Sequence, residues 1–140
     1  MTSPERTHSL PVRIYYEDTD AGGVVYHANY LKFAERGRTE FLRALGHENS
    51  TLSKELGMIF VVRHVEIDYL KTAHLDDLCS LKTSISALKN TSFIMHQCLE
   101  RDGEVICDMQ VVIVCVDSKT LKPVRLPEKV KNEFEQFLET

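Results

Sequence analysis

The pattern of apolar and polar residues predicts one long helix, from Asn29 to Leu45. Within it, apolar residues recur every three or four positions and form a single stripe. Asn29 is the expected N-cap, and Gly46 is placed to be the first residue beyond the helix. Gly37 lies in the stripe, where glycine weakens a helix, so we expect close approach to a sheet or a partner there. The stripe comprises Tyr30, Phe33, Ala34, Gly37, Phe41, Ala44 and Leu45.

Elsewhere the apolar residues alternate with polar ones, which predicts strands. The expected strands are Leu10–Glu17, Phe60–Leu70, Leu78–Leu88, Thr91–Arg101 and Glu104–Val116. Lys89-Asn90 and Asp102-Gly103 are the expected turns of two successive hairpins. This order predicts an α+β fold, in which five antiparallel strands bury one face against the long helix.

Two shorter helices complete the expected elements. One is expected at Thr51–Leu56. The other is a terminal helix with Pro127 as its first residue. Its apolar residues at helical spacing are Val130, Phe134, Phe137 and Leu138.

Composition fits one soluble domain spanning residues 1–140, because no repeat, linker or low-complexity tract divides the chain. The hydrophobic fraction is 43% and the charged fraction 27%, which is ordinary for a globular protein. The net charge of −4 argues against a general binder of nucleic acid or anionic membranes. Any bound phosphate would therefore need a local cluster of positive charge.

Cysteine and histidine usage predicts a reduced protein without a metal site. The cysteines form no CxxC pair and lie in apolar or alternating stretches, so we expect buried thiols. The six histidines show no HxxxH spacing and no His/Cys cluster, so no zinc site is expected. The N-terminus lacks the apolar core of a signal peptide, and the longest apolar run, Val111–Val116, is too short to span a bilayer. These features predict a cytoplasmic protein.

Candidate chemistry lies in the glycine-bearing loop Asp18–His27, between the first strand and the long helix. Asp20 could act there as a nucleophile or activate water, and the glycines after it would let a ligand approach the backbone. The same Asp-x-x-Gly pattern is common in plain turns, which the loop by itself favours. An EF-hand is not supported, because its fifth and twelfth positions would be Gly22 and Asn29. The chain also has no GxGxxG, P-loop or GxSxG motif.

From Arg13 to Tyr30 the sequence reads RIYYEDTDAGGVVYHANY, which resembles the active-site signature of the 4-hydroxybenzoyl-CoA thioesterase family. Within that family it is most similar to the Tol–Pal-associated acyl-CoA thioesterases of bacteria. Further likeness covers Glu35–Arg43, Phe60–Lys71, Leu75–Asp77 and Val114–Asp117, and so extends over nearly the whole chain. The resemblance implies the hotdog fold and hydrolysis of short- to medium-chain acyl-CoA to free acid and coenzyme A.

The resemblance also implies roles for residues of the loop. Asp20 would be the catalytic carboxylate, either nucleophile or general base, while Asp18 would order the loop. His27 would orient water or polarise the substrate, although on sequence alone it could equally pack the helix start. His27 and Ala21 replace an aromatic residue and a proline of the aryl-CoA branch, which points away from 4-hydroxybenzoyl-CoA as substrate.

Lys89, Ser92 and Lys122 resemble the nucleotide contacts of the family, and basic side chains suit the phosphates of coenzyme A. Arg125 is a weaker candidate, and each lysine could equally be an ordinary surface residue. Hotdog active sites lie between subunits, so we expect a homo-oligomer, a dimer or a tetramer. The N-terminus of the long helix or a partner chain would then supply oxyanion donors.

No separate cofactor is expected, since coenzyme A belongs to the substrate. Two alternatives stay open. One is a hotdog dehydratase or hydratase, which would release no thiol from acyl-CoA. The other is a weakly catalytic module that binds acyl-CoA or acyl carrier protein and is indifferent to Asp20→Asn.

Overall fold

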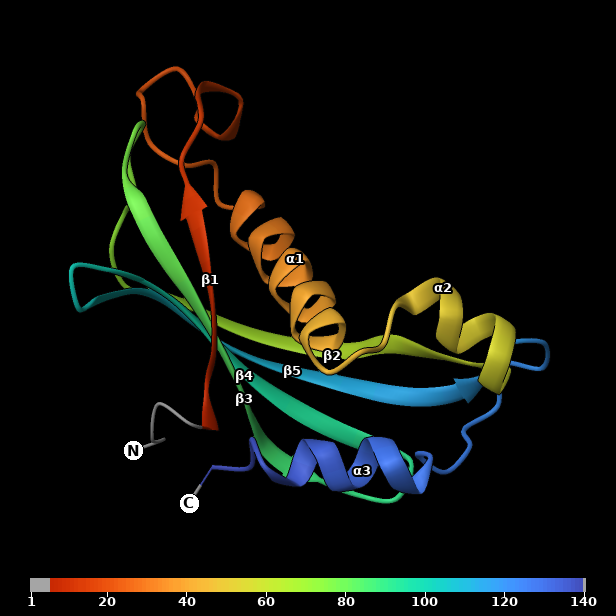
Figure 1. The fold of residues 1–140 in the computed structure, drawn as a ribbon. Coiled ribbons are helices and arrows are strands. Elements are labelled where there is room, and N and C mark those ends of the chain that lie inside the picture. The colour runs from red at the N-terminus through yellow and green to blue at the C-terminus, as the bar shows by residue number, and fades with distance from the viewer. Residues whose placement is uncertain (1–5, 140) are drawn as a thin grey trace.

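The computed structural model describes residues 6–139, and its central element is one five-stranded antiparallel sheet (Figure 1). The strand order is β1-β3-β4-β5-β2, so β1 and β2 form the two edges. The strands are β1 (His8–Arg13), β2 (Met58–Tyr69), β3 (Leu78–Leu88), β4 (Ser92–Arg101) and β5 (Glu104–Asp117). The prediction of five antiparallel strands is confirmed, and β3 has the predicted bounds.

Helix α1 (Asn29–Ala44) crosses one face of this sheet, which we call the inner face (Figure 1). Strand β4 shows the alternation that results: Phe93, Met95, Gln97 and Leu99 are buried, and the residues between them are only partly buried. The latter side chains lie on the opposite, outer face, because successive side chains of a strand point to opposite sides.

Gly37 is the point of closest approach between α1 and the inner face. A Cβ atom added to Gly37 would lie 2.1 Å from Cδ2 of Leu81 and 3.1 Å from Nε2 of Gln97. The fully buried Gln97 amide donates to the Ala34 carbonyl at 2.9 Å and to the Thr83 hydroxyl at 3.1 Å. The predicted close approach is confirmed, and the sheet is what the helix approaches.

The two ends of α1 differ in how well the sequence predicted them. The N-cap residue is Ala28, so the prediction of Asn29 as N-cap is wrong. The Asn29 side chain instead donates to the Asp18 carbonyl at 2.8 Å. At the other end Gly46 has a φ of 88°, and its N–H donates to the Arg43 carbonyl at 2.9 Å, as predicted for a glycine beyond a helix.

The buried stripe of α1 also departs from the prediction near its C-terminal end. Tyr30, Phe33, Ala34, Gly37 and Phe41 are buried as expected. Leu42 is buried and Ala44 is exposed, which reverses their expected places.

The first strand is shorter than predicted. It ends at Arg13, and residues Tyr16–Asp18 form a turn of 3₁₀ helix. The Asp18 carboxylate accepts the Tyr15 N–H at 2.8 Å, which stabilises this turn in place of further strand pairing. Tyr16, expected to continue the buried face, is 82% exposed.

Two further helical segments lie near their expected positions. Residues Asn49–Thr51 form α2, which continues as a π-helical turn over Leu52–Leu56. Helix α3 (Glu128–Glu135) begins one residue after Pro127, which is its N-cap rather than its first residue. Its buried Phe134 packs against Phe93, with ring centroids 4.9 Å apart, so α3 covers part of the inner face.

The last described residues, beyond α3, run beside the edge of β3. Leu138 forms a parallel bridge with Ile85, and the Glu139 N–H donates to the Ile85 carbonyl at 2.7 Å. The terminal apolar residues Phe137 and Leu138 were expected inside the helix, and the structure places them after it.

Candidate active site

Asp18 organises the loop that joins β1 to α1. Its side chain is buried and accepts the Tyr15 N–H, while its carbonyl accepts the Tyr26 N–H at 3.1 Å and the Asn29 side chain at 2.8 Å. Asp18 thus connects the start of the loop at Tyr15 with its later part at Tyr26 and with the first residue of α1, Asn29. This arrangement agrees with the ordering role expected for Asp18.

Asp20 lies at the tip of the same loop, where it closes a tight turn. Its carbonyl accepts the Gly23 N–H at 3.1 Å, and its N–H donates to the Val24 carbonyl at 2.9 Å. Gly23 has a φ of 76°, a conformation that favours glycine. The Asp20 side chain is exposed, and its Oδ1 accepts the Gly22 N–H at 2.9 Å. Asp20 is therefore both a turn residue and a carboxylate that solvent and ligands can reach.

His27 lies two residues before the first residue of α1 and is exposed. Its ring centroid is 4.5 Å from that of Tyr26 and 6.3 Å from that of Tyr69, whose hydroxyl donates to the His27 carbonyl at 3.2 Å. An isolated antiparallel bridge joins Thr19 to Val25; Asp20 directly follows Thr19 at the turn, and His27 lies two residues beyond Val25. Within residues 6–139 no hydrogen bond or ion pair joins them.

The segment that precedes β3, residues 73–75, is hydrogen-bonded to the loop. The Val25 N–H donates to the Ala73 carbonyl at 2.9 Å, and the Leu75 N–H donates to the Gly23 carbonyl at 3.1 Å. The buried Tyr30 hydroxyl accepts the Ala73 N–H at 3.1 Å, and burial raises the pKa of this phenol. The signature residue Tyr30 thus serves to position the loop.

An ion pair that the sequence did not reveal secures this segment. Arg101 on β4 donates to the Asp77 carboxylate at 2.6 Å, and the same oxygen accepts the His74 N–H at 2.8 Å. Burial opposes ionisation of Asp77, but these partners outweigh it and hold the pKa of Asp77 below its ordinary value. The sequence likeness at Leu75–Asp77 did not reveal Arg101 as the partner of Asp77. Arg101 reaches Asp77 only because β3 and β4 pair in the folded sheet.

Lys89, Ser92 and Lys122 gather at one end of the sheet. The Lys89 N–H donates to the Ser92 carbonyl at 2.8 Å in the β3–β4 turn, and Ser92 pairs with Val114 of β5. The Lys122 carbonyl accepts the Asp117 N–H at 2.9 Å, where β5 ends. Both lysines and the neighbouring Arg125 are exposed. Backbone pairing thus brings the segments that carry these residues to the same end of the sheet, and their role in binding phosphate stays a prediction.

The Asp20 loop lies at the opposite end of the sheet from these residues (Figure 1). The loop is hydrogen-bonded to the segment that leads into Leu78, the first residue of β3. Lys89 instead directly follows Leu88, the last residue of β3. A strand rises about 3.3 Å per residue, so the 11 residues of β3 have a length of about 35 Å and place the two groups at opposite ends of it. One chain therefore does not bring Asp20 together with Lys89, Ser92 and Lys122.

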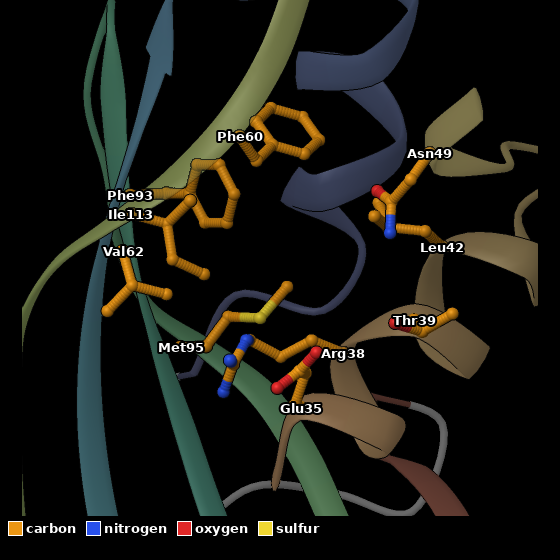
Figure 2. Close-up of a pocket in the computed structure, with 10 residues that line it drawn as sticks. All are labelled: Glu35, Arg38, Thr39, Leu42, Asn49, Phe60, Val62, Phe93, Met95 and Ile113. Atoms are coloured by element: carbon orange, nitrogen blue, oxygen red, sulfur yellow. The ribbon is translucent and has the colours of Figure 1, made fainter. Parts of the chain in front are cut away.

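A pocket of about 270 Å³ lies between α1 and the inner face (Figure 2). Its wall on the sheet side is apolar, and Glu35 and Arg38 on α1 supply its charged groups. Arg38 donates to Oε1 of the Gln97 side chain at 3.1 Å, and burial lowers the pKa of its guanidinium while Glu35 opposes that change. The lining residues are Glu35, Arg38, Thr39, Leu42, Asn49, Phe60, Val62, Phe93, Met95 and Ile113.

The sequence did not indicate this pocket. In the sequence, Glu35 and Arg38 border the apolar stripe of the helix. Charged residues border such a stripe on any amphipathic helix, so their position does not predict a pocket. The pocket requires the curved sheet and α1 to be placed together.

Comparison with known proteins identifies the family. Residues 15–134 match the model of the thioesterase-like superfamily. The chain is 48% identical over 126 residues to the acyl-CoA thioesterase YbgC of Haemophilus influenzae, covering 90% of this chain and 93% of that protein. It is 42% identical over 127 residues to the acyl-CoA thioester hydrolase YbgC of Escherichia coli O157:H7, covering 90% and 94%. The chain belongs to the thioesterase-like superfamily.

A solved structure agrees with this assignment. The crystal structure of a probable thioesterase from Bartonella henselae superposes with a TM-score of 0.82 at 41% identity, covering 86% of this chain and 99% of that one. The predicted hotdog fold is confirmed. Among the helices of residues 6–139, none has both the length and the apolar character needed to cross a membrane. The cytoplasmic location stays a prediction.

Proposed function

We propose that this protein hydrolyses the thioester of acyl-CoA to free acid and coenzyme A. The observation that carries the proposal is the exposed Asp20 carboxylate, held on an ordered turn near the start of α1. Its supporting context is membership of the thioesterase-like superfamily and close similarity to proteins named acyl-CoA thioesterases.

Two routes are open to this carboxylate. As a nucleophile, Asp20 attacks the thioester carbonyl carbon, coenzyme A leaves as the thiolate, and water hydrolyses the resulting anhydride. As a general base, Asp20 takes a proton from water, which attacks the same carbon directly. Both routes place negative charge on the carbonyl oxygen, and the N-terminus of α1 offers backbone N–H groups and a positive dipole end to stabilise it.

His27 is proposed to act at the substrate and not on Asp20. It is exposed and close to the first residue of α1, and it makes no hydrogen bond to Asp20 within the described chain. From that position it can orient the attacking water or polarise the thioester carbonyl.

The complete site is proposed to combine two chains. Asp20 would come from one subunit, and Lys89, Ser92 and Lys122 of a second subunit would bind the phosphates of coenzyme A. The length of β3 supports this division, since one chain holds the two groups at opposite ends of this strand of 11 residues. A homodimer is the minimum assembly for such a site, and a homotetramer is compatible with it.

The edge strand β2 supports association of this kind. Its outer edge has no neighbour in the sheet of the described chain, and such edges favour pairing with another strand. It also carries large apolar side chains that are 37–57% exposed at or just beyond the strand. They are Val61, Val62, Tyr69 and Leu70.

The acyl group is proposed to be short to medium in length. The pocket beside α1 has a volume of about 270 Å³, close to the lower limit of about 300 Å³ for ligand pockets in general. Phe93, Met95 and Ile113 give it an apolar floor suited to a hydrocarbon chain.

The deciding experiment is free-thiol release from a panel of acyl-CoAs with short, medium, long and aromatic acyl groups. Wild type should hydrolyse the panel with a preference for short to medium chains. Asp20→Asn should lose at least about 100-fold in kcat, the range expected for removing an acid–base or nucleophilic group. Asp102→Asn is the matched control, because Asp102 is an exposed turn aspartate with positive φ that asparagine tolerates.

Equal rates for wild type and Asp20→Asn would contradict the assigned role. Binding of acyl-CoA without thiol release would favour the binding module, and addition or loss of water at the acyl chain would favour a dehydratase or hydratase. Full activity in a species that light scattering shows to be a single chain would contradict the site shared between subunits.

A further inference from the structure

A compact group of metal-binding side chains lies on the outer face of the sheet. His96 and Cys98 are two residues apart on β4, so their side chains leave the same face. Asp108 on β5 pairs directly with Cys98. One ligand atom from each of the three residues lies within 4.8 Å of the others, and all three are partly buried.

The orientation of the His96 ring is fixed by a second carboxylate. Glu139 approaches Nδ1 of His96 at 2.6 Å, and the Ser84 hydroxyl donates to the same Glu139 oxygen at 2.8 Å. The other ring nitrogen, Nε2, therefore faces Asp108, whose Oδ1 is 2.5 Å away. A carboxylate on the far nitrogen of a histidine is the usual support for a metal-binding imidazole, because it fixes the tautomer and raises ligand basicity.

We propose that His96 Nε2, Cys98 Sγ and the Asp108 carboxylate form a binding site for a zinc-type divalent cation. An imidazole nitrogen, a thiolate and a carboxylate together suit Zn²⁺ better than Ca²⁺ or Mg²⁺, which prefer oxygen ligands. Glu100 lies next to this group, since the Cys98 thiol donates to its Oε2 at 3.5 Å.

The cation takes the place of protons that these groups hold in its absence. The Cys98 thiol donates its proton to Glu100, so Zn²⁺ must displace this proton to bind the sulfur. It must also displace the proton shared by Nε2 and Asp108. In a tetrahedral zinc site these two ligand atoms would be about 3.3 Å apart, so they must separate by roughly 0.8 Å.

The site is separate from the proposed catalytic residues. It lies on the face of β4 and β5 opposite α1, whereas the pocket is lined by inner-face residues such as Met95 and Ile113. Through Glu139 it reaches the segment that runs beside β3. A bound cation would therefore tie β4, β5 and this terminal segment together and stabilise the fold.

The test is Zn²⁺ binding measured by calorimetry and by competition with a chromogenic chelator. Wild type should bind one Zn²⁺ per chain. Cys98→Ser and Asp108→Asn should each weaken binding by at least about 100-fold, the upper end of the loss seen when even a supporting residue is removed. His64→Gln is the matched control, because His64 is exposed and has its own carboxylate partner, Glu66, at 3.3 Å. It should leave binding unchanged.

Thermal unfolding in the presence of a chelator establishes that each variant is folded. A second measurement needs only wild type: Zn²⁺ should slow alkylation of Cys98 at least about tenfold, since a coordinated thiolate is protected, while the other three cysteines are buried. Absence of saturable binding by wild type would overturn the proposal. So would equal binding by Cys98→Ser, unprotected alkylation, or loss of binding in His64→Gln.

Discussion

Replacing Gly37 by alanine tests how closely α1 is held against the sheet. The new Cβ would lie 2.1 Å from Cδ2 of Leu81, whereas carbon atoms in contact stay about 3.5–4.0 Å apart. The two atoms must therefore separate by at least about 1.4 Å. Leu81 is fully buried on β3, so its side chain must shift against packed neighbours to make this room.

The net effect follows from two opposing contributions. Overpacking a buried site costs about 1–3 kcal/mol, and the short distance places Gly37→Ala near the upper end. Alanine in place of glycine inside a helix stabilises it by about 1 kcal/mol. We therefore expect Gly37→Ala to lower the free energy of unfolding by about 2 kcal/mol.

Urea denaturation at one fixed protein concentration measures this difference, because association would otherwise change the apparent stability. Lys32→Ala is the control, since Lys32 is exposed on the same helix. Leu81→Ala alone should cost about 2–5 kcal/mol, but adding Gly37→Ala to it should cost nothing further. An unchanged or higher stability of the single variant Gly37→Ala would refute the reasoning.

Two further predictions concern the support of the Asp20 loop. Asp77 has a lower pKa in the folded chain than in the unfolded one, whose value is 3.8. The contribution of Asp77 to stability is therefore complete at a pH above the unfolded pKa, and it is lost as the pH falls through the folded pKa. Acid titration of stability should show that Asp77→Asn flattens this loss, and a curve identical to that of wild type would contradict the role of the Arg101 pair. Asp18→Ala removes the acceptor of the Tyr15 N–H and should cost about 1–2 kcal/mol in urea denaturation. It should also slow thiol release, and wild-type values for both would show that the loop orders itself without this carboxylate.

The sequence by itself determined the main elements and their order. A period of two predicted β3 to the residue, and a period near four predicted α1, because burial on one face requires those spacings. Glycine in the buried stripe predicted the close approach at Gly37. The family signature predicted Asp20 as the catalytic carboxylate, which stays a proposal, and the structure shows only that this carboxylate lies on an ordered turn.

Local competition explains where the sequence prediction was wrong. The alternating pattern continued through Tyr16, but the Asp18 side chain bonds to the Tyr15 backbone and ends the strand earlier. Likewise Asn29 has the right side chain for an N-cap, yet that side chain bonds across the loop to the Asp18 carbonyl. Such bonds depend on which backbone groups lie nearby, which a pattern of polar and apolar residues does not encode.

Only the tertiary structure decided which distant residues meet. Strand register places Asp108 beside Cys98 and His96, although the sequence showed no His/Cys spacing typical of a metal site. The length of β3 keeps Asp20 away from Lys89, although both belong to the same proposed site. Periodicity reports which face of an element is buried, but pairing partners and through-space distances arise only when the strands assemble into one sheet.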